Sequence, residues 1–374
     1  MQIIIGADLC ITPTIEECFS RGSIEEYIDE DIIGILSRAD YRIFNLEGPV
    51  VDGGIAIDKC GPNLKMSPKS FGGISRLHPD LITLANNHIM DYGSEGYEST
   101  IEILNKYCID YVGVGSSVYE MKKAHFIEVG DKIIAIYACA EHEFSIAEGN
   151  KPGANAFDPL ETFDDIAKLK EKSDYIVVLY HGGKERYRFP SPYQQRVFRK
   201  LAEKGANLVI SQHTHCVGCV EKYKNSTLIY GQGNFIFDSC DDEYWNSGLL
   251  VQLDVSDDMA DHVSYIPFVK QGGMIHLDSK YGRVLKGFEE RSISIKNPSY
   301  IAERYDLYVK ENEKNYLAAI AGDSVVIRIL RKLFGISFYR YLYNKTAANR
   351  LYDYLICESH NDLLKQVVNL FRSP

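Results

Sequence analysis

The chain has 374 residues, of which 45% are hydrophobic and 25% are charged, and its formal net charge at pH 7 is -11. This length holds one large domain with an appendage, or two domains, and the composition is ordinary for a globular protein. The acidic balance argues against non-specific binding to nucleic acid, because phosphate backbones are bound by basic patches. It does not exclude a small anionic substrate that a local metal ion holds.

Neither the N-terminus nor the cysteines indicate an exported protein. The first residues resemble a strand rather than a signal peptide, and no window reaches the roughly 18 apolar residues that span a bilayer. The nine cysteines are scattered and odd in number, which predicts reduced thiols. Cys216 and Cys219 form a C-x-x-C pair, but without a second pair we favour a structural role over zinc or redox chemistry. We therefore expect a soluble, cytoplasmic protein, with any contact to the inner membrane being peripheral.

Short apolar runs that lead to polar side chains recur in the first two thirds of the chain. Runs of this kind are typical of strands buried on both faces. The predicted strands cover residues 3–5, 41–44, 81–84, 176–180, 208–210 and 228–230. The polar residues that follow them are Asp8, Glu47, Asn86, Asn87, His88, His181, His213 and Asn234.

Helical periodicity lies between the predicted strands, over residues 25–38, 94–107, 163–172 and 192–204. Alternating strands and helices predict an α/β layered fold. In such folds ligands bind beyond the carboxyl ends of the strands. We therefore expect the polar residues that follow the strands to gather at one edge of a sheet.

The pattern changes near residues 280–300. Residues 301–372 read as amphipathic helix, rich in Tyr, Leu and Arg, without the strand pattern. We predict a main domain over residues 1–290 and a helical C-terminal extension over residues 291–374. Within the extension, residues 325–343 carry basic side chains among apolar ones. This segment either packs against the main domain, which we favour, or lies on an anionic membrane surface.

Histidine and carboxylate side chains at strand ends matter because neutral imidazole and ionised carboxylate bind Zn, Mn or Fe. Such an ion lowers the pKa of a bound water and provides a nucleophile at neutral pH. His213-Thr-His215 is the strongest local element, because residues i and i+2 of an extended turn can reach one ion. The alternative is a surface loop with two exposed histidines.

The segment around His88 permits two interpretations. Asn86, Asn87, His88 and Asp91 can supply an amide ligand and a general acid. The same residue types also cap helices for purely structural reasons.

The residues at the other strand ends also permit more than one interpretation. Asp8 is either a ligand or a turn residue, and Glu47 is either a ligand or a capping or ion-paired carboxylate. His181 precedes two glycines, which permit close approach of a substrate or metal ion. We expect Asn234 to brace the site or the fold.

Together these motifs resemble the bacterial capsule-synthesis CapA (poly-γ-glutamate capsule) family, which is similar in fold to the calcineurin-like metallophosphatases. The resemblance spans roughly residues 1–255, and it is specific because the motifs come in the order of the family. The motifs are Gly6-Ala-Asp8, Asn45-Leu-Glu47-Gly-Pro49, Leu84-Ala-Asn-Asn-His88-Ile-Met-Asp91-Tyr-Gly93, His181-Gly-Gly-Lys-Glu185, Gln212-His-Thr-His215 and Ile229-Tyr-Gly-Gln-Gly-Asn-Phe-Ile-Phe-Asp238.

The resemblance implies a four-layer α/β/β/α sandwich with a metal site. Asp8 would be the bridging carboxylate and would take part in catalysis. Glu47 would stand where metallophosphatases usually place an Asp. The first strand departs from the metallophosphatase pattern, because Cys10 occupies the position of the histidine in Asp-x-His. We expect Cys10 to be a small buried hydrophobe rather than a thiolate ligand.

The resemblance also assigns the remaining ligands. Asn87, His181 and His213 would bind one divalent ion and His215 the other, with one or two Mn, Zn or Fe ions in all. His88 would be the general acid. The residues implied to contact the substrate or support the ligands are Asn86, Asp91, Glu185 and Asn234.

The leading hypothesis is a metal-dependent hydrolase in capsule or cell-envelope polymer biosynthesis, acting on a phosphoester or on a γ-glutamyl or related amide. Its expected partners are an anionic polymer or a small phosphorylated or γ-glutamyl substrate. The alternative is a non-catalytic polymer-assembly or binding factor on a degenerate metallophosphatase scaffold. A ligase or transferase that exchanges γ-amides is a third, weaker hypothesis.

Overall fold

The computed structural model describes residues 1–147, 149, 151–238, 240, 242–255, 262–278, 282–322 and 324–372. Its contacts divide the chain into two compact units, Met1–Ile301 and Ala302–Pro374. The boundary lies beyond residue 290 because α8 (Arg283–Ser294) packs on strands β11 and β15 of the first unit.

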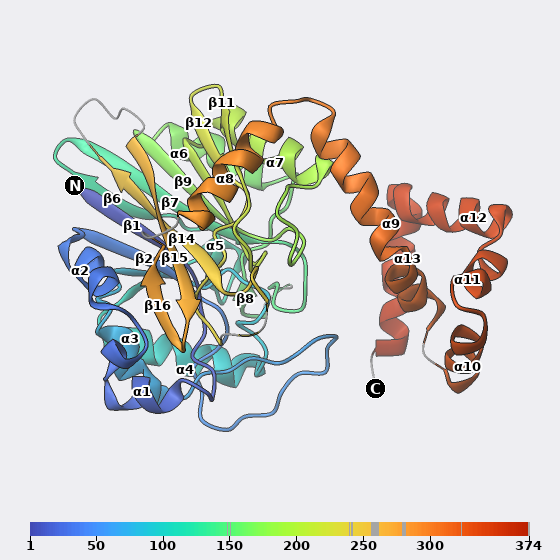
Figure 1. Cartoon of the computed structure of the whole chain (residues 1–374), viewed down its shortest axis with the longest axis horizontal. Coiled ribbons are helices and arrows are strands. Elements are labelled where there is room, and N and C mark those ends of the chain that lie inside the picture. Colours follow the sequence, from blue (N-terminus) through green and yellow to red (C-terminus); the bar gives the residue numbers. More distant parts are fainter. Residues whose placement is uncertain are drawn as a thin grey trace. The chain divides into compact units, whose positions relative to one another are not determined.

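The first unit contains a mixed sheet in which β1 lies at the centre (Figure 1). Strands β1 to β4 run parallel to one another, as strands joined by helical crossovers do. On the other side of β1, each successive strand runs antiparallel to its neighbour. The order is β16 (Met274–Leu277), β15 (His262–Gln271), β14 (Ser247–Asp254), β1 (Gln2–Leu9), β2 (Tyr41–Leu46), β3 (Leu81–Thr83) and β4 (Asp110–Val112), and β13 (Asn234–Ile236) pairs with the end of β1.

A second sheet has a parallel centre and antiparallel edges. Its order is β11 (Val220–Tyr223), β12 (Ser226–Ile229), β10 (Leu208–Gln212), β9 (Tyr175–His181), β7 (Lys132–Ala140) and β6 (His125–Val129). The short strands β5 (Val114–Gly115) and β8 (Gly153–Ala154) form a separate pair.

Side-chain alternation shows that the two sheets are stacked between helices. On β1, Ile3 and Ile5 belong to a buried cluster that also contains Val177 of β9, so this cluster lies between the sheets. Ile4 points to the other face, into a cluster with the helices that cover the first sheet. Val178 likewise faces helices on the outside of the second sheet. The predicted four-layer α/β/β/α sandwich is therefore confirmed, and burial on both faces explains the uninterrupted apolar strands.

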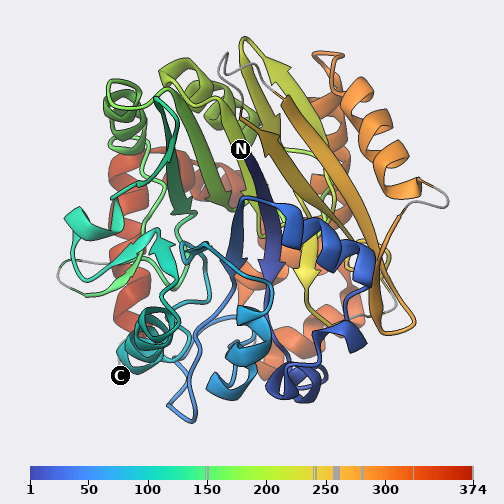
Figure 2. The same ribbon diagram turned by 90° about the vertical axis from the view of Figure 1, so that its left-hand side faces the viewer.

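The helices of the first unit cover the outer faces of both sheets (Figure 2). On the first sheet these are α1 (Glu16–Arg21), α2 (Glu30–Arg38), α3 (Phe71–Ser75) and α4 (Gly93–Lys106). On the second they are α6 (Thr162–Lys170) and α7 (Pro192–Lys204). The remaining helical turns are η1 (Ile24–Glu26), η2 (Pro68–Ser70) and α5 (Val118–Met121).

Three of the four predicted helices correspond to α4, α6 and α7, and the fourth, predicted over residues 25–38, is correct only from Glu30. The chain there forms η1, breaks, and begins α2 at Glu30. The Asp29 side chain accepts a hydrogen bond from the Asp31 backbone nitrogen at 2.9 Å, which caps the new helix. Ile28 instead pairs with Ile275 in an isolated parallel bridge, so the tertiary fold interrupts the periodic pattern.

The second unit is helical, as predicted for the C-terminal extension. It contains most of α9 (Tyr300–Ala321) and then α10 (Val325–Phe334), α11 (Ile336–Leu342), α12 (Lys345–Ile356) and α13 (Glu358–Arg372). Across the described parts of both units, none of the helices combines the length and apolar character needed to cross a bilayer.

Candidate metal centre

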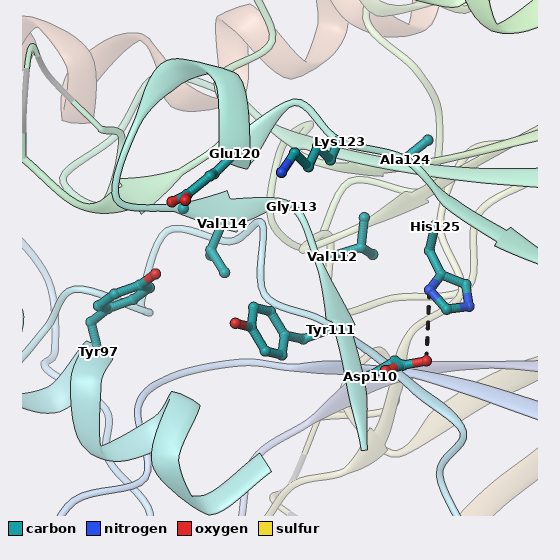
Figure 3. A pocket seen from close by; sticks show the side chains of 11 residues that line it. Tyr97, Asp110, Tyr111, Val112, Gly113, Val114, Glu120, Lys123, Ala124 and His125 are labelled. Atoms are coloured by element: carbon teal, nitrogen blue, oxygen red, sulfur yellow. Dashed lines mark ion pairs between the residues drawn. The ribbon is translucent and has the colours of Figure 1, made fainter. Parts of the chain in front are cut away.

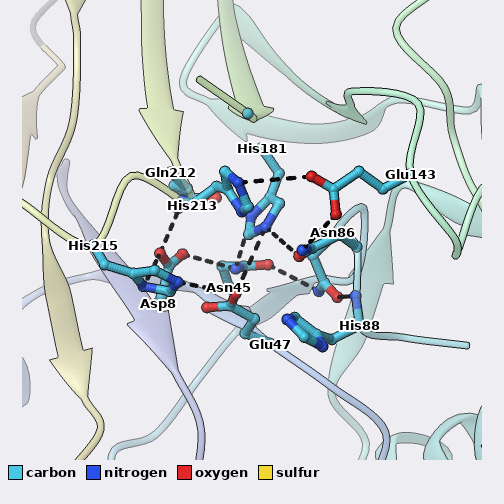
Figure 4. A network of polar contacts seen from close by, with 12 residues as sticks. Asp8, Asn45, Glu47, Asn86, His88, Glu143, His181, Gln212, His213 and His215 are labelled. Carbon is cyan, nitrogen blue, oxygen red and sulfur yellow. Dashed lines mark hydrogen bonds and ion pairs between the residues drawn. The ribbon is translucent and has the colours of Figure 1, made fainter. Parts of the chain in front are cut away.

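The predicted site residues lie together, but they come from two sheets (Figure 4). Asp8 is on β1 and Glu47 directly follows β2, whereas His181 ends β9 and His213 directly follows β10. The expectation of a single sheet edge is therefore wrong. The carboxyl ends of parallel strands in two stacked sheets meet at the same end of the sandwich, and each sheet supplies part of the set.

Glu47 is the residue around which the imidazoles gather. Its side chain is fully buried, and neither carboxylate oxygen has a hydrogen-bond partner in the described structure. One of these oxygens, Oε1, lies 3.8 Å from His181 Nε2 and 3.7 Å from His215 Nε2. Burial, and then the nearby carboxylate of Asp8, raises the pKa of Glu47 well above its ordinary value. A buried carboxylate in this condition needs either a proton or a cation.

The three histidines are held in the neutral form. Burial, followed by repulsion from neighbouring imidazoles, lowers the pKa of His181 well below its ordinary value. Burial likewise lowers the pKa of His213 and of His215 to about 3. Neutral imidazole is the form that binds a metal ion.

The His213-Thr-His215 turn has an unusual backbone. His213 has φ 81° and His215 has φ 50°, and both values lie in the left-handed region that non-glycine residues seldom adopt. Conformations of this kind cost on the order of 1–3 kcal/mol and cluster at functional sites. Here they turn both imidazoles toward Glu47. Ligand atoms of Glu47, His213 and His215 lie within 4.8 Å of one another.

Asp8 is buried and hydrogen-bonded through both oxygens. It accepts from Asn45 Nδ2 at 2.8 Å and from the His213 backbone nitrogen at 2.9 Å. Burial raises the pKa of Asp8 to about 6, although these hydrogen bonds oppose the shift. Asp8 therefore fixes the His213 turn against β1, and its Oδ2 lies 3.9 Å from His215 Nδ1.

Asn45 is a site residue that the sequence analysis missed. Its Nδ2 contacts His181 Nδ1 at 3.3 Å as well as Asp8, and its Oδ1 accepts from Asn86 Nδ2 at 3.2 Å. It thus connects the two sheets beneath the site. The signal was available, because Asn45 lies two residues before Glu47 at the end of the same strand.

The two asparagines after β3 have different positions. Asn86 donates to the Leu46 carbonyl at 2.8 Å and accepts from the His88 backbone nitrogen at 3.1 Å, so it holds the turn. Asn87 Oδ1 lies 3.0 Å from His181 Nε2, and its Nδ2 donates to Glu143 Oε2 at 2.9 Å. Asn87 therefore places an amide oxygen beside the histidines.

His88 forms a pair with a buried carboxylate. Its Nδ1 lies 2.6 Å from Asp91 Oδ2, and Asp91 also accepts from the Leu64 backbone nitrogen at 2.7 Å. Lys59, whose side chain is 2% exposed, lies 2.5 Å from Asp91 Oδ1 and 3.1 Å from His88 Nδ1. Sequence reasoning missed Lys59, because it lies in a loop that carries no strand or helix pattern.

The other predicted supporting residues also lie at the site. Asn234 Oδ1 lies 2.7 Å from His215 Nδ1 and accepts its proton, which leaves Nε2 as the ring nitrogen with the lone pair. Glu185 is exposed at the rim of the site, and partial desolvation of its carboxylate raises its pKa. The Trp245 ring, which the sequence analysis did not single out, lies 4.5 Å from the His215 ring between centroids.

A cavity of about 350 Å³ gives access to this cluster. The candidate general acid His88, the carboxylates of Glu143 and Glu185, two aromatic rings and the loop that carries Lys59 form its walls. Its lining includes Lys59, Asn87, His88, Glu143, Glu185, His215, Phe237 and Trp245.

A second, larger cavity of about 430 Å³ lies elsewhere (Figure 3). It is lined by Tyr97, Tyr111, Glu120 and Lys123, and by His125, whose Nδ1 lies 3.9 Å from Asp110 Oδ2. None of the predicted site residues lines it, so size alone does not identify the functional site.

The cysteines are all free, and Cys10 lies buried beside the site. Burial, and then the nearby Glu47 carboxylate, raises the pKa of the Cys10 thiol well above its ordinary value. The thiol is therefore neutral and serves as a small hydrophobe, as expected from the sequence. Cys216 and Cys219 are also buried, and burial raises the pKa of each thiol.

The donor set fits a divalent cation. Ligands of one ion, each about 2.0–2.2 Å from it, lie roughly 3–4 Å apart. The separations of 3.0, 3.8 and 3.7 Å among Asn87, His181, Glu47 and His215 fall in this range. The unpaired oxygens of Glu47 and the unpaired Nδ1 of His213 are buried polar atoms of the kind that a bound ion satisfies.

The chain therefore forms a four-layer α/β/β/α sandwich with a cluster of imidazole, carboxylate and amide groups at the ends of its strands. The sequence model of the family described as "Bacterial capsule synthesis protein PGA_cap" matches residues 3–239. This match covers more than half of the chain, and the chain belongs to that family, as the motif resemblance indicated.

Relatives of known name agree with this assignment. The chain is 27% identical over 247 residues to the capsule biosynthesis protein CapA of Bacillus anthracis, covering 64% of this chain and 60% of that protein. It is 29% identical over 221 residues to the PGA biosynthesis protein CapA of Bacillus subtilis, covering 58% and 57%. The chain thus spans about three fifths of the length of these relatives.

Among solved structures, the chain is similar to a crystal structure described as a novel phosphatase from Mycoplasma pneumoniae. The TM-score is 0.45 at 14% identity, covering 76% of this chain and 96% of that one.

Proposed function

We propose that this protein is a divalent-metal-dependent hydrolase that acts on a phosphoester or a γ-glutamyl-type amide during synthesis of a capsule or envelope polymer. The observation that carries the proposal is Glu47, a fully buried carboxylate without hydrogen-bond partners that lies within 4 Å of two neutral imidazoles. Such an arrangement is costly unless a proton or a cation neutralises the carboxylate, and the neutral imidazoles beside it favour the cation. Membership in the capsule-synthesis family supports the polymer context.

Glu47, His213 and His215 would form the centre of the metal site, with His181, Asn87 and Asp8 beside them. A divalent ion bound there would lower the pKa of a water and polarise an oxygen of the substrate. Imidazole nitrogens combined with carboxylate and amide oxygens suit Mn, Zn or Fe, as one or two ions.

The residues of the chain supply the proton chemistry. Asp91 accepts from Nδ1 of His88, which orients the ring. Nε2 of His88 then becomes the atom that gives a proton to the leaving group. The ammonium group of Lys59, beside this pair in the cavity wall, offsets the negative charge of Asp91.

A non-catalytic polymer-assembly or binding factor is the second candidate, and Cys10 is the observation that favours it. The position that metallophosphatases usually fill with a ligand histidine carries a buried, neutral thiol here. This candidate predicts a folded protein that binds its polymer without metal-dependent turnover.

The nine free cysteines support a reducing compartment. We therefore also propose a cytoplasmic location for the described part of the chain.

One experiment separates the two candidates. The protein is purified without chelator, its metal content is determined, and hydrolysis of an aryl phosphate and of a γ-glutamyl anilide is measured with added Mn²⁺. We expect turnover of one substrate, and a loss of about 100-fold or more in the His88→Ala variant. His276→Ala is the matched control, because His276 forms a similar pair with Asp29 at 3.0 Å outside the site.

Equal rates for wild type and His88→Ala would reject the proposed acid. A protein that contains metal and hydrolyses neither substrate would support the non-catalytic candidate.

A further inference from the structure

Helix α10 has an apolar face that its own unit leaves uncovered. Val325, Ile329 and Leu333 share this face at helical spacing, and they are 63%, 53% and 69% exposed. Val326 beside them is 65% exposed, and none of the side chains of α10 is buried. Neighbouring α11 differs, because its Tyr339 is fully buried.

The other side of α10 is basic. Arg328 and Arg331 occupy positions that helical spacing places away from Ile329 and Leu333, and Lys332 lies at the edge of the apolar face. The charge is also segregated along the sequence. The segment 324–352, called here the basic segment, carries no acidic residue and six basic ones, namely Arg328, Arg331, Lys332, Arg340, Lys345 and Arg350. The whole chain, in contrast, has a net charge of -11.

We propose that α10, with the start of α11, docks on the surface of an anionic lipid bilayer. A helix that lies in the membrane interface combines an uncovered apolar face with Lys and Arg on its polar side, and both features are present here. A run of cations without intervening acids complements anionic headgroups. The aromatic side chains of Phe334 and Tyr341, 59% and 85% exposed, add apolar area next to this charge.

The geometry indicates that the helix lies flat rather than crossing the bilayer. Its 10 residues extend about 15 Å, roughly half the thickness of the hydrocarbon core. The docking would bring the chain to the membrane, independently of whether the metal centre is catalytic.

Helix α13 provides an internal comparison. It also exposes apolar side chains, with Leu363 62% and Val367 42% exposed. However, Glu358 and Asp362 lie on the same helix, and acidic side chains are repelled by anionic lipid. The proposal therefore assigns the contact to α10 and not to every exposed apolar face of the helical unit.

Vesicle flotation of the full chain tests the proposal. Vesicles of equimolar phosphatidylglycerol and phosphatidylcholine are compared with vesicles of phosphatidylcholine alone. We expect flotation only with the anionic vesicles, and weaker binding at high salt. The triple variant Arg328→Gln, Arg331→Gln and Lys332→Gln should bind about 100-fold more weakly. The double variant Ile329→Ser and Leu333→Ser should lose at least about tenfold.

The matched control is Leu363→Ser with Val367→Ser on α13, which should bind as wild type does. Because all the substituted side chains are exposed or half-buried at the surface of the helices, circular dichroism should be unchanged.

Three results would overturn the proposal. One is the absence of flotation by the wild-type chain, and another is equal flotation by all the variants. The third is self-association that the Ile329 and Leu333 substitutions alone abolish, without vesicle binding, because this would identify the face as a contact between copies.

Discussion

Replacing Glu47 by Gln should stabilise the metal-free protein and abolish stabilisation by metal. The amide is nearly isosteric, carries no charge to bury, and can donate to the free lone pair of His215 Nε2, 3.7 Å from the carboxylate. Removing an uncompensated buried carboxylate is worth about 1–3 kcal/mol. The first unit has about 300 residues, so its unfolding entropy near 60 °C is roughly 0.6 kcal/mol/K, and the Tm should rise by roughly 2–5 °C.

Metal should stabilise only the wild type. Mn²⁺ at about 100 times its Kd stabilises the wild type by about 2.7 kcal/mol, or roughly 4 °C, and should leave the Glu47→Gln variant unchanged. The assay is differential scanning fluorimetry of protein stripped with a chelator, with and without Mn²⁺.

The matched control is Glu221→Gln, for which the change in Tm should have the opposite sign. Glu221 is also a carboxylate of low exposure, but it accepts from Arg199 Nε and from the Tyr230 hydroxyl, both at 2.8 Å. Its replacement should lower the Tm with or without metal. A Glu47→Gln variant that is less stable than wild type without metal, or that Mn²⁺ stabilises as strongly, would refute the reasoning.

Three further predictions concern pH, the buried pair and the backbone. Because the pKa of Asp8 is raised from 3.8 to about 6, its contribution to the stability of metal-free protein is present in acid and is lost as pH rises from 3.8 through about 6. The proton on Asp8 also competes with metal, so the affinity for Mn²⁺ should fall by up to about tenfold per pH unit below pH 6. Calorimetry measures this affinity, and a constant value across that range would exclude Asp8 from the site. Lys59→Met should lower the free energy of unfolding in urea by about 3 kcal/mol, since it leaves the buried Asp91 carboxylate without its cation. Adding Asp91→Asn should recover most of the loss, and Lys65→Met at an exposed position should leave the free energy of unfolding unchanged. Gly218→Ala should destabilise by about 3 kcal/mol, because the new Cβ would lie 1.7 Å from the Tyr230 carbonyl oxygen, whereas Gly72→Ala, which meets no atom within 4 Å, should unfold like wild type.

The strand predictions succeeded because the apolar runs report burial directly. Residues 176–180 are uninterruptedly apolar, and β9 is buried at every position from Tyr175 to His181. The prediction of helix over 25–38 failed before Glu30 for a tertiary reason. The break at Ile28 depends on a bridge to Ile275, almost 250 positions away, and no local pattern encodes it.

The residues of the site also divide into those that the sequence predicted and those that it did not. Asp8, Glu47 and the histidines follow predicted strands, so their place at a strand end was readable from the sequence. Lys59 and Glu143 lie in loops whose paths depend on packing against the rest of the molecule. Their contacts with His88 and Asn87 were therefore not predictable.

The amino-acid sequence determined which segments form strands, which side chains follow them, and that the C-terminal part is helical. These properties depend on periodicity and local burial, which neighbouring residues report. Only the tertiary structure decided that the strands divide between two stacked sheets, that Glu47 is left without a partner among the histidines, and that Asn45 joins the two halves beneath them. These outcomes depend on contacts between residues far apart in the sequence, such as 37 positions between Asn45 and Asp8 and 136 between Asn45 and His181. No local pattern specifies which distant partner a buried polar group meets.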